Sequence, residues 1–327
     1  MYLVRDYQQV PESYRGAVVA LGNFDGVHRG HRTVMEQAKK IAEADGAAAG
    51  VLTFEPHPRL VFTPDSPPFR LTPFRTKVRR LKALGLDLLV SLRFNKALFS
   101  KPAEQFVRDV LVDGLGVSHV VVGYDFVFGA KRSGDAALLQ RLGEELGFAV
   151  TVMSPVTHGD DVCSSTIIRV NLETGRVRRA AELLGHWWEV EGRVRGGDQR
   201  GRTIGFPTLN LALMPQALRP SLGVYAVHVG FPKGDKTVWH KGVANIGNRP
   251  TFGGKSVLLE AHIFDFSELV YGHLTRVALV EQLRGEVKFD GLDALKAQIT
   301  RDGMQARDIL QRPENAVHFF HQGNGGH

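Results

Sequence analysis

The chain has 327 residues and a hydrophobic content of 43%, which leaves room for two domains with cores of their own. Its one cysteine, Cys163, excludes a disulfide framework and favours a reducing compartment. Because we find neither a signal-like N-terminus nor an apolar run of the roughly 20 residues that span a bilayer, we expect a cytoplasmic protein. The net charge of +7 comes from scattered basic residues, which gives no support to a nucleic-acid or membrane partner.

In the first half of the chain, apolar runs alternate with amphipathic stretches. This alternation is typical of a parallel, doubly wound α/β sheet. The apolar runs predict buried strands at residues 17–21, 50–54, 87–92, 119–123 and 148–153, and the amphipathic stretches predict helices that include 33–44 and 101–115.

Near residue 185 the pattern changes to short alternating segments separated by Gly and Pro. This pattern predicts an antiparallel β-barrel, closed by a helix over about 292–310, with 171–185 as a helical connector. We therefore expect an α/β domain over residues 1–184, a β domain over 185–313 and a frayed tail over 314–327.

A glycine-rich segment follows the first predicted strand, with the sequence Gly22-Asn23-Phe24-Asp25-Gly26-Val27-His28-Arg29-Gly30-His31. A buried strand that runs through such a turn into a helix is how α/β proteins present backbone N–H groups to a phosphate. The two histidines share a face of the first helical turn, and Gly30 lets a phosphate chain approach. The segment therefore predicts a triphosphate site. A metal pair with Asp25 nearby and a purely structural turn are the alternatives.

Three further polar clusters follow later strands, where a doubly wound sheet places its site. Prolines on both sides fix His57, and Asp125 is the one acid among aromatic residues after the fourth strand. The third cluster precedes a helix and offers hydroxyls and a guanidinium to phosphate oxygens, with a plain N-cap and a surface arginine as the alternative. Its members are Ser164, Ser165, Thr166 and Arg169.

Segments 22–31, 54–58, 122–129 and 164–169 resemble, in order and spacing, the adenylyltransferase half of the bacterial bifunctional riboflavin kinase/FAD synthetase family. The second half of that family is a riboflavin kinase barrel, whose motifs also follow here. The resemblance covers residues 2 to about 313, and it implies a nucleotidyltransferase-type sheet followed by a Greek-key, riboflavin-kinase-like barrel. The kinase-like motifs are Gly201-Arg202-Thr203-Ile204-Gly205-Phe206-Pro207-Thr208-Leu209-Asn210, the segment 242–252, Leu259-Glu260-Ala261-His262 and Arg284-Gly285-Glu286-Val287-Lys288-Phe289.

The resemblance implies that ATP and Mg²⁺ are used twice, to make FMN from riboflavin and then FAD from FMN. The FMN phosphate is already anionic, so the second reaction needs positioning and charge stabilisation rather than a base. We expect His28, His31 and Arg169 to stabilise charge as pyrophosphate leaves. The expected binding residues of this half are Gly22, Asn23, Phe24, Asp25, Gly30, His57, Asp125, Ser164, Ser165 and Thr166.

The kinase reaction needs a base, because the ribityl alcohol is a poor nucleophile whose proton must be removed. The resemblance implies that Glu260 is this base, the alternative being an ordinary strand acid facing solvent. Thr208 and Asn210 are the expected Mg²⁺ ligands, the alternative being turn chemistry after Pro207. The other expected binding residues are Gly201, Arg202, Gly205, Pro207, Asn245 and Arg284.

Some positions depart from common patterns. Segment 196–203 has the spacing of a Walker A loop, but Pro207 would fall inside the helix that such a loop opens, so we interpret the segment as a flap over a nucleotide. Leu209 replaces the family's alanine and is expected to point away from the metal ligands. The family's acid is missing from Leu269-Val270-Tyr271-Gly272, and Trp187 and Trp188 are expected to pack rather than to stack on flavin.

Three functions follow from these patterns. The first is the bifunctional enzyme, with riboflavin, FMN, FAD and ATP as partners and a monomeric or weakly oligomeric state. The second is an enzyme in which only one half, the kinase, is active. The third is a flavin- or nucleotide-binding regulator without turnover. The presence of both His28/His31 and Glu260 argues against it, because a pure binder has no use for a base that acts on an alcohol.

Overall fold

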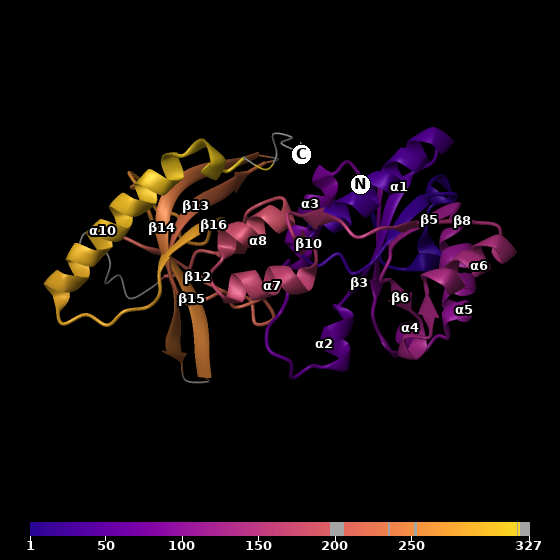
Figure 1. Cartoon of the computed structure of the whole chain (residues 1–327), viewed down its shortest axis with the longest axis horizontal. Coiled ribbons are helices and arrows are strands. Elements are labelled where there is room, and N and C mark those ends of the chain that lie inside the picture. Colours follow the sequence, from indigo (N-terminus) through magenta and orange to yellow (C-terminus); the bar gives the residue numbers. More distant parts are fainter. Residues whose placement is uncertain (197–205, 235, 252–253, 319, 321–327) are drawn as a thin grey trace. The chain divides into compact units, whose positions relative to one another are not determined.

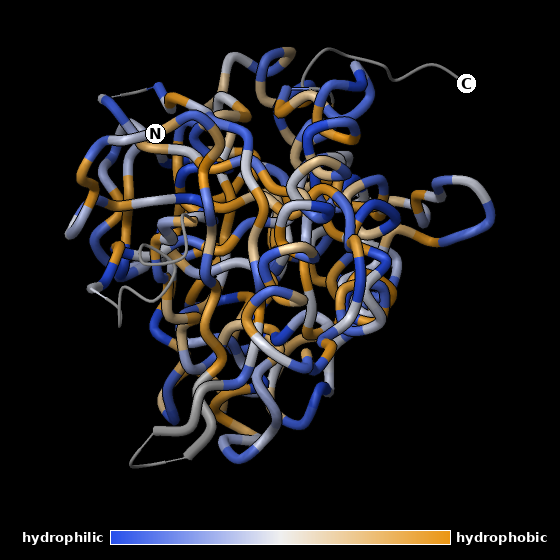
Figure 2. The backbone as a smooth tube through the Cα atoms, turned by 90° about the vertical axis from the view of Figure 1, so that its left-hand side faces the viewer, coloured by the Kyte–Doolittle hydropathy of each residue, from blue (hydrophilic) through white to orange (hydrophobic). Residues whose placement is uncertain are grey.

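The computed structural model describes residues 1–196, 206–234, 236–251, 254–318 and 320. The chain forms two compact units: the first consists of Met1–Pro67 and Thr72–Cys163, and the second of Pro68–Leu71 and Ser164–His327. Several loops at the outer edge of the traced backbone are hydrophilic, and hydrophobic residues recur along the segments between them (Figure 2).

The first unit, drawn mainly in indigo to magenta in Figure 1, is built on a six-stranded parallel sheet with the order β1-β4-β3-β2-β5-β8. From β2 the chain extends the sheet in one direction through β3 and β4, and then in the other through β5 and β8, so the strand order reverses between β2 and β5. The strands are β1 (Tyr2–Val4), β2 (Val18–Leu21), β3 (Ala49–Glu55), β4 (Leu88–Arg93), β5 (His119–Gly123) and β8 (Ala149–Met153).

Helices cover both faces of this sheet, because alternate strand residues belong to two separate cores. Val18 and Ala20 pack with Met35 of α1 and Leu81 of α3, whereas Val19 packs with residues from α5 to α6. The sheet is therefore doubly wound, as the sequence predicts. The helices are α1 (Arg29–Asp45), α2 (Pro58–Phe62), α3 (Phe74–Ala83), α4 (Lys96–Phe99), α5 (Ala103–Phe106), a π-helical segment (Val107–Leu115) and α6 (Ala136–Leu146).

The five predicted strands of this unit all form, with ends that differ by at most one residue from the prediction. The edge strand β1 was not predicted, because its three residues are too few to show a period. Two short hairpins complete the unit. They are formed by β6 (Val127–Phe128) with β7 (Gly134–Asp135), and by β9 (Thr157–His158) with β10 (Asp161–Val162).

The second unit contains a six-stranded antiparallel sheet with the order β11-β16-β13-β14-β15-β12. Strands β13, β14 and β15 follow one another as hairpins and β16 returns beside β13, which is a Greek-key arrangement. A backbone bridge between Arg195 and Asn210 joins the two edges of the sheet. The strands are β11 (Trp188–Arg193), β12 (Leu209–Ala212), β13 (Gly223–Lys233), β14 (Lys236–Thr251), β15 (Gly254–Ile263) and β16 (Leu274–Arg284).

The predicted C-terminal helix is α10 (Leu292–Gln311), which packs Ala306, Ile309 and Leu310 against one face of the sheet. Helices α7 (Ser165–Glu173) and α8 (Val177–Leu184) also belong to this unit, and Ala181 of α8 joins the same core. The fold class predicted from the sequence is confirmed: a doubly wound parallel sheet is followed by a Greek-key sheet with a C-terminal helix.

A short segment from the first part of the sequence, Pro68–Leu71, is built into the second unit. Arg70 forms a parallel bridge with Ala217, and the indole of Trp188 donates a hydrogen bond to the Leu71 carbonyl at 2.9 Å. Phe69 and Leu71 are 3% and 2% exposed, so they are core residues of the second unit. The boundary predicted at residues 184 and 185 stays a prediction for the functional domains, since the compact units divide at Cys163 and Ser164.

Candidate functional site

The glycine-rich segment lies between the end of β2 and the start of α1, beside the point where the strand order reverses. Ligands of open α/β sheets bind at this point, because the loops that follow the strands on either side separate there. Phe24 and Val27 have positive φ values of 49° and 48°, although neither is glycine. Such strained backbone persists only where the surroundings hold it, and it is frequent at functional sites.

His28 is the N-cap of α1, and its Nδ1 accepts a hydrogen bond from the backbone N–H of His31 at 3.3 Å. Accepting through Nδ1 leaves the ring proton on Nε2. The His28 and His31 rings stack with centroids 3.5 Å apart, and the edge of Phe24 meets the His31 ring. The two histidines therefore form one rigid pair at the helix N-terminus, where backbone N–H groups and the helix dipole favour an anion.

Gly30 lies in a confined space next to this pair. A Cβ at Gly30 would be 3.1 Å from the carbonyl oxygen of Cys163 and 3.2 Å from the His28 ring. The position therefore has a packing reason for glycine besides the phosphate approach that the sequence predicts. Cys163 itself is buried.

Asn23 and Asp25 are held by neighbouring elements of the same unit. The carboxylate of Asp25 is 2% exposed and accepts a hydrogen bond from the backbone N–H of Thr72 at 3.0 Å. The carbonyl of Asn23 accepts hydrogen bonds from Thr53 and Lys77. These contacts shape the loop, so the binding roles predicted for Asn23 and Asp25 stay predictions.

His57 and Asp125 follow the ends of β3 and β5. His57 is the N-cap of α2, and its Nδ1 accepts from the N–H of Arg59 at 3.1 Å. It thus repeats the arrangement of His28 and keeps its ring proton on Nε2. Asp125 is exposed two residues after Gly123, the last residue of β5. Both side chains follow carboxyl ends of strands, as predicted.

Ser164 and Arg169 belong to the second unit, on and before α7. The hydroxyl of Ser164 accepts from the N–H of Ile167 at 3.3 Å, which makes Ser164 the N-cap. The guanidinium of Arg169 donates to the carbonyl of Phe69 at 2.9 Å and lies over the Phe69 ring. Ser165 and Thr166 form the first turn of α7. The phosphate roles of these residues stay predictions.

In the second unit, three predicted site residues form a row across neighbouring strands. Glu260 of β15 pairs with Asn210 of β12 on one side and with Asn245 of β14 on the other. Directly opposite side chains of antiparallel strands share one face of the sheet, with Cβ atoms about 5 Å apart. We refer to Asn210, Glu260 and Asn245 as the cross-strand row.

The side chains of the cross-strand row have no hydrogen-bond or ion-pair partner among the residues that the structure describes. Asn210 is 6% exposed, and its side-chain oxygen is a buried acceptor without a partner in that set. A buried amide oxygen normally has a partner, so this one is available to a water molecule, an ion or a ligand. Leu209, next to it, is 5% exposed and starts the strand with its side chain on the opposite face, as expected.

The oxygen donors around this row suit a hard divalent cation. The Asn210 amide of β12 lies opposite the Glu260 carboxylate of β15, and Thr208, with its hydroxyl, comes directly before β12. The described residues contain no group of three His, Cys, Asp or Glu side chains suited to a metal. A cation at this row would therefore depend on hydroxyl and amide oxygens, which fit Mg²⁺ better than Zn²⁺.

Two side chains beside the row were not among the predicted site residues. His262, two positions after Glu260, donates from Nδ1 to the carbonyl of Pro207 at 2.8 Å and so holds the residue before Thr208. The carboxylate of Glu286 lies 2.8 Å from the place that a Cβ of Gly247 would occupy, next to the Asn245 amide. Both belong to motifs visible in the sequence, but only the strand pairing brings them to the row.

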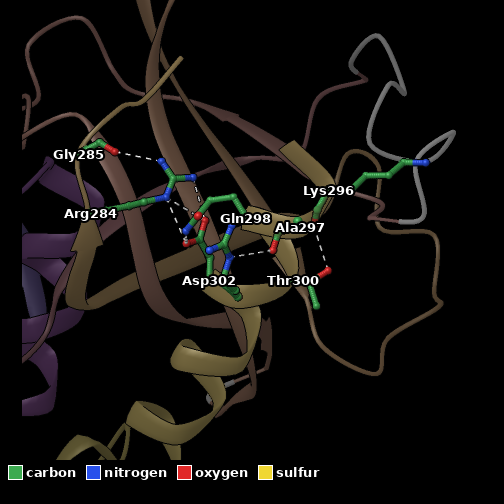
Figure 3. A network of polar contacts seen from close by, with 8 residues as sticks. Arg284, Gly285, Lys296, Ala297, Gln298, Thr300 and Asp302 are labelled. Atoms are coloured by element: carbon green, nitrogen blue, oxygen red, sulfur yellow. Dashed lines mark hydrogen bonds and ion pairs between the residues drawn. The ribbon is translucent and has the colours of Figure 1, made fainter. Parts of the chain in front are cut away.

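Arg284 has a structural partner. Its guanidinium donates to both carboxylate oxygens of Asp302 at 2.8 to 3.1 Å and to the Gly285 carbonyl (Figure 3). Gln298 donates to the same carboxylate at 2.8 Å. This network ties α10 to the end of β16, so the binding role predicted for Arg284 stays a prediction. The predicted residues Gly201, Arg202 and Gly205 lie outside the described residues.

The fold and the two groups of polar residues define a class: a nucleotidyltransferase-type α/β unit joined to a kinase-type Greek-key barrel. The model of the FAD synthetase family matches residues 10–167, and that of the riboflavin kinase family matches residues 184–310. The chain belongs to the family of bifunctional riboflavin kinase/FMN adenylyltransferases. The resemblance drawn from the motifs is thereby confirmed.

Relatives of that name match this chain over nearly its whole length. The Escherichia coli K12 protein is 42% identical over 307 residues, which cover 94% of this chain and 96% of the relative. The Bacillus subtilis protein is 36% identical over 312 residues, with the same coverage. A crystal structure from Streptococcus pneumoniae, described as a macrolide-efflux protein, has a TM-score of 0.84 at 30% identity and covers 94% of this chain and 98% of its own.

In the described part of the chain, no helix is both long enough and apolar enough to cross a membrane.

Proposed function

We propose that this chain phosphorylates riboflavin to FMN and then adenylylates FMN to FAD and pyrophosphate, with ATP as co-substrate of both steps. The observation that carries the proposal is the cross-strand row, in which a carboxylate stands between two amides that have no partner among the described residues. Family membership supports the two reactions, and the row supports a site for the first of them in the second unit.

In the kinase step, Glu260 accepts the proton of the ribityl primary alcohol while the alcohol oxygen attacks the terminal phosphate of ATP. Asn245 lies directly opposite Glu260 on β14, where its amide can orient the alcohol or a phosphate oxygen. Thr208 and Asn210 would hold Mg²⁺, and the orphaned amide oxygen of Asn210 supports this assignment. When bound, the cation offsets negative charge on the ATP phosphates.

In the adenylyl step, the FMN phosphate attacks the α-phosphate of ATP without the help of a base. His28 and His31 are at the N-terminus of α1, and His28 keeps a proton on Nε2 that it can donate to a phosphate oxygen. His57 can donate in the same way from the N-terminus of α2. Arg169 and the hydroxyls of residues 164–166 are proposed to bind phosphate at the start of α7.

The test is to incubate the purified full chain with riboflavin, ATP and Mg²⁺ and to separate the flavins by chromatography. Accumulation of FMN and then of FAD supports the proposal. FMN without FAD would mean that only the kinase half is active, and unchanged riboflavin together with unchanged supplied FMN would mean a binding protein without turnover. A parallel reaction without Mg²⁺ tests whether the two steps need the cation. The cytoplasmic location and the monomeric or weakly oligomeric state stay predictions from the sequence.

A further inference from the structure

A lysine that none of the predicted sites includes, Lys77 of α3, lies beneath the glycine-rich loop. Its side chain is fully buried, at 0% exposure. Burial of an ammonium group is unfavourable unless charged and polar partners surround it. The partners of the Lys77 ammonium group therefore indicate its role in the structure.

The ammonium group of Lys77 contacts three acceptors at the ends of two neighbouring strands. It donates to the Asn23 carbonyl at 2.8 Å and to the Thr53 hydroxyl at 3.4 Å, and it forms an ion pair with Glu55 at 3.3 Å. The Thr53 hydroxyl donates to the same Asn23 carbonyl at 3.1 Å. An ammonium group has three N–H donors, so it can direct one N–H group at each of these three acceptors.

Two of these acceptors, Asn23 and Glu55, stand where a loop with predicted site histidines begins. Asn23 is the second residue after β2 and leads to His28 and His31. Glu55 is the last residue of β3 and comes two positions before His57. The ammonium group thus joins the starting points of the two histidine loops.

The segment that leads into α3 holds the first loop at a second point. The backbone N–H of Thr72 donates to the Asp25 carboxylate, five residues before Lys77 in the chain. Phe24, with its positive φ of 49°, lies between the two anchored residues of the loop, Asn23 and Asp25. A backbone conformation of this kind is kept only where contacts on both sides impose it.

We propose that Lys77 is a positioning residue for adenylyl transfer, which fixes the backbone of the glycine-rich loop and its register with the His57 loop. It acts through the Asn23 carbonyl and the Glu55 carboxylate and does not itself touch ATP. The inference rests on the proposed function, since it assigns a role in the FAD-forming reaction. It adds a buried residue of α3 to a site whose predicted residues lie on loops and near the N-terminal ends of α1 and α7.

The test compares Lys77→Met with Lys39→Met in the full chain. Lys39 of α1 is a matched control, because its ammonium group also donates to a backbone carbonyl of the first unit, that of Leu84 at 2.6 Å, but away from the histidine loops. We expect Lys77→Met to lower kcat for FAD formation from FMN by roughly 100-fold, as misplacement of reacting groups by about 1 Å can do. Riboflavin phosphorylation by the same molecules should change less than twofold in both variants.

A second variant separates positioning from stability. Lys77→Met leaves the Glu55 carboxylate without its ammonium partner at 3.3 Å, so the variant is expected to melt at a lower temperature. In Lys77→Met/Glu55→Gln that charge is removed, and we expect the melting temperature to rise towards the wild-type value. FAD formation should stay low, because the Asn23 carbonyl has still lost its ammonium donor and keeps only the Thr53 hydroxyl.

Thr53→Val provides a milder variant if the others do not fold. It removes the second donor to the Asn23 carbonyl with little change of shape, and it should lower FAD formation in the same direction by a smaller factor.

Three results would overturn the proposal. One is a Lys77→Met variant whose FAD formation per folded molecule equals that of Lys39→Met. Another is recovery of FAD formation in the double variant in step with its melting temperature. The third is Thr53→Val with wild-type FAD formation. A wild-type chain that forms no FAD would instead reject the proposed function itself, so the two failures are distinguishable.

Discussion

The two units of this chain provide polar side chains in different ways. In the first unit, His28, His57 and Asp25 each accept a hydrogen bond from a backbone N–H group, and so they hold the local backbone in place. In the second unit, the side chains of the cross-strand row have no partner among the described residues.

The difference follows from how each backbone is satisfied. A parallel sheet ends in loops and helix N-termini, whose N–H groups need acceptors that the sheet does not supply. Loop side chains must provide some of them. Antiparallel strands satisfy one another's backbone groups, so side chains at mid-strand positions remain for a ligand. We therefore expect substitutions in the first unit to alter local structure and activity together, and those in the row to alter activity alone.

The largest expected effect is that of Glu260→Gln. Loss of the base should lower riboflavin phosphorylation by roughly 100- to 10,000-fold, since general-base catalysis contributes a factor of this size. The melting temperature and FAD formation from supplied FMN should not change, because Glu260 has no structural partner among the described residues. Both activities are measured by chromatography of the flavins, with Glu281→Gln on β16 as the control. An equal loss of both activities would contradict the role of Glu260.

Next in size are His31→Ala and His28→Ala, which should stop the reaction at FMN. Loss of one donor to a phosphate in a water-poor site costs about 3 kcal/mol, or on the order of 100-fold in FAD formation. His28→Ala also removes the N-cap of α1, so it should lower the free energy of unfolding by a further ~1 kcal/mol, whereas His31→Ala should not. Thermal melts combined with FAD assays test the pair. Normal FAD formation in both variants would show that the loop is only structural.

Asp302→Asn should affect stability more than catalysis. The Asp302 carboxylate has 5% side-chain exposure and holds the Arg284 guanidinium, which is 20% exposed. Removal of one partner of such a pair is expected to cost about 2 kcal/mol, less than for a fully buried pair because water can reach the arginine. Urea unfolding measures the loss. If stability is unchanged while KM for ATP rises, Arg284 is a binding residue in the first place.

The smallest effect is a pH dependence of stability in the second unit. Burial lowers the pKa of His228 below the usual 6.5, with Lys241 and His318 acting in the same direction and a hydrogen bond to the Asn315 carbonyl opposing them. The unfolded chain then binds a proton that the folded unit does not, so stability falls as pH drops below about 6.5, by at most ~1.4 kcal/mol per pH unit. His228→Gln should flatten unfolding curves measured between pH 5 and 7.5. An unchanged slope would show that another group titrates.

Many features could be predicted because they are local. The spacing of apolar residues predicts the strand at 119–123 and the helix that begins at Leu292. The order of residues predicts the glycine-rich loop. Lys77 was missed although it occupies the buried stripe of α3, four residues before Leu81. A lysine in an apolar stripe is a usable signal, but the sequence does not say which distant carbonyl it meets.

The sequence by itself determined the two types of sheet, their order along the chain and the residues that could take part in binding or catalysis. It could do so because hydrophobic period and motif spacing are properties of neighbouring residues. Tertiary structure decided which of those residues meet. Glu260 joins Asn210 and Asn245 only through the register of β12, β14 and β15, where a shift of one residue would turn the side chain to the opposite face. Likewise, Pro68–Leu71 belongs to the second unit, because apolar side chains pack against whatever surface lies nearest in space. Lys77 binds the Asn23 carbonyl, because a buried ammonium group needs a nearby acceptor.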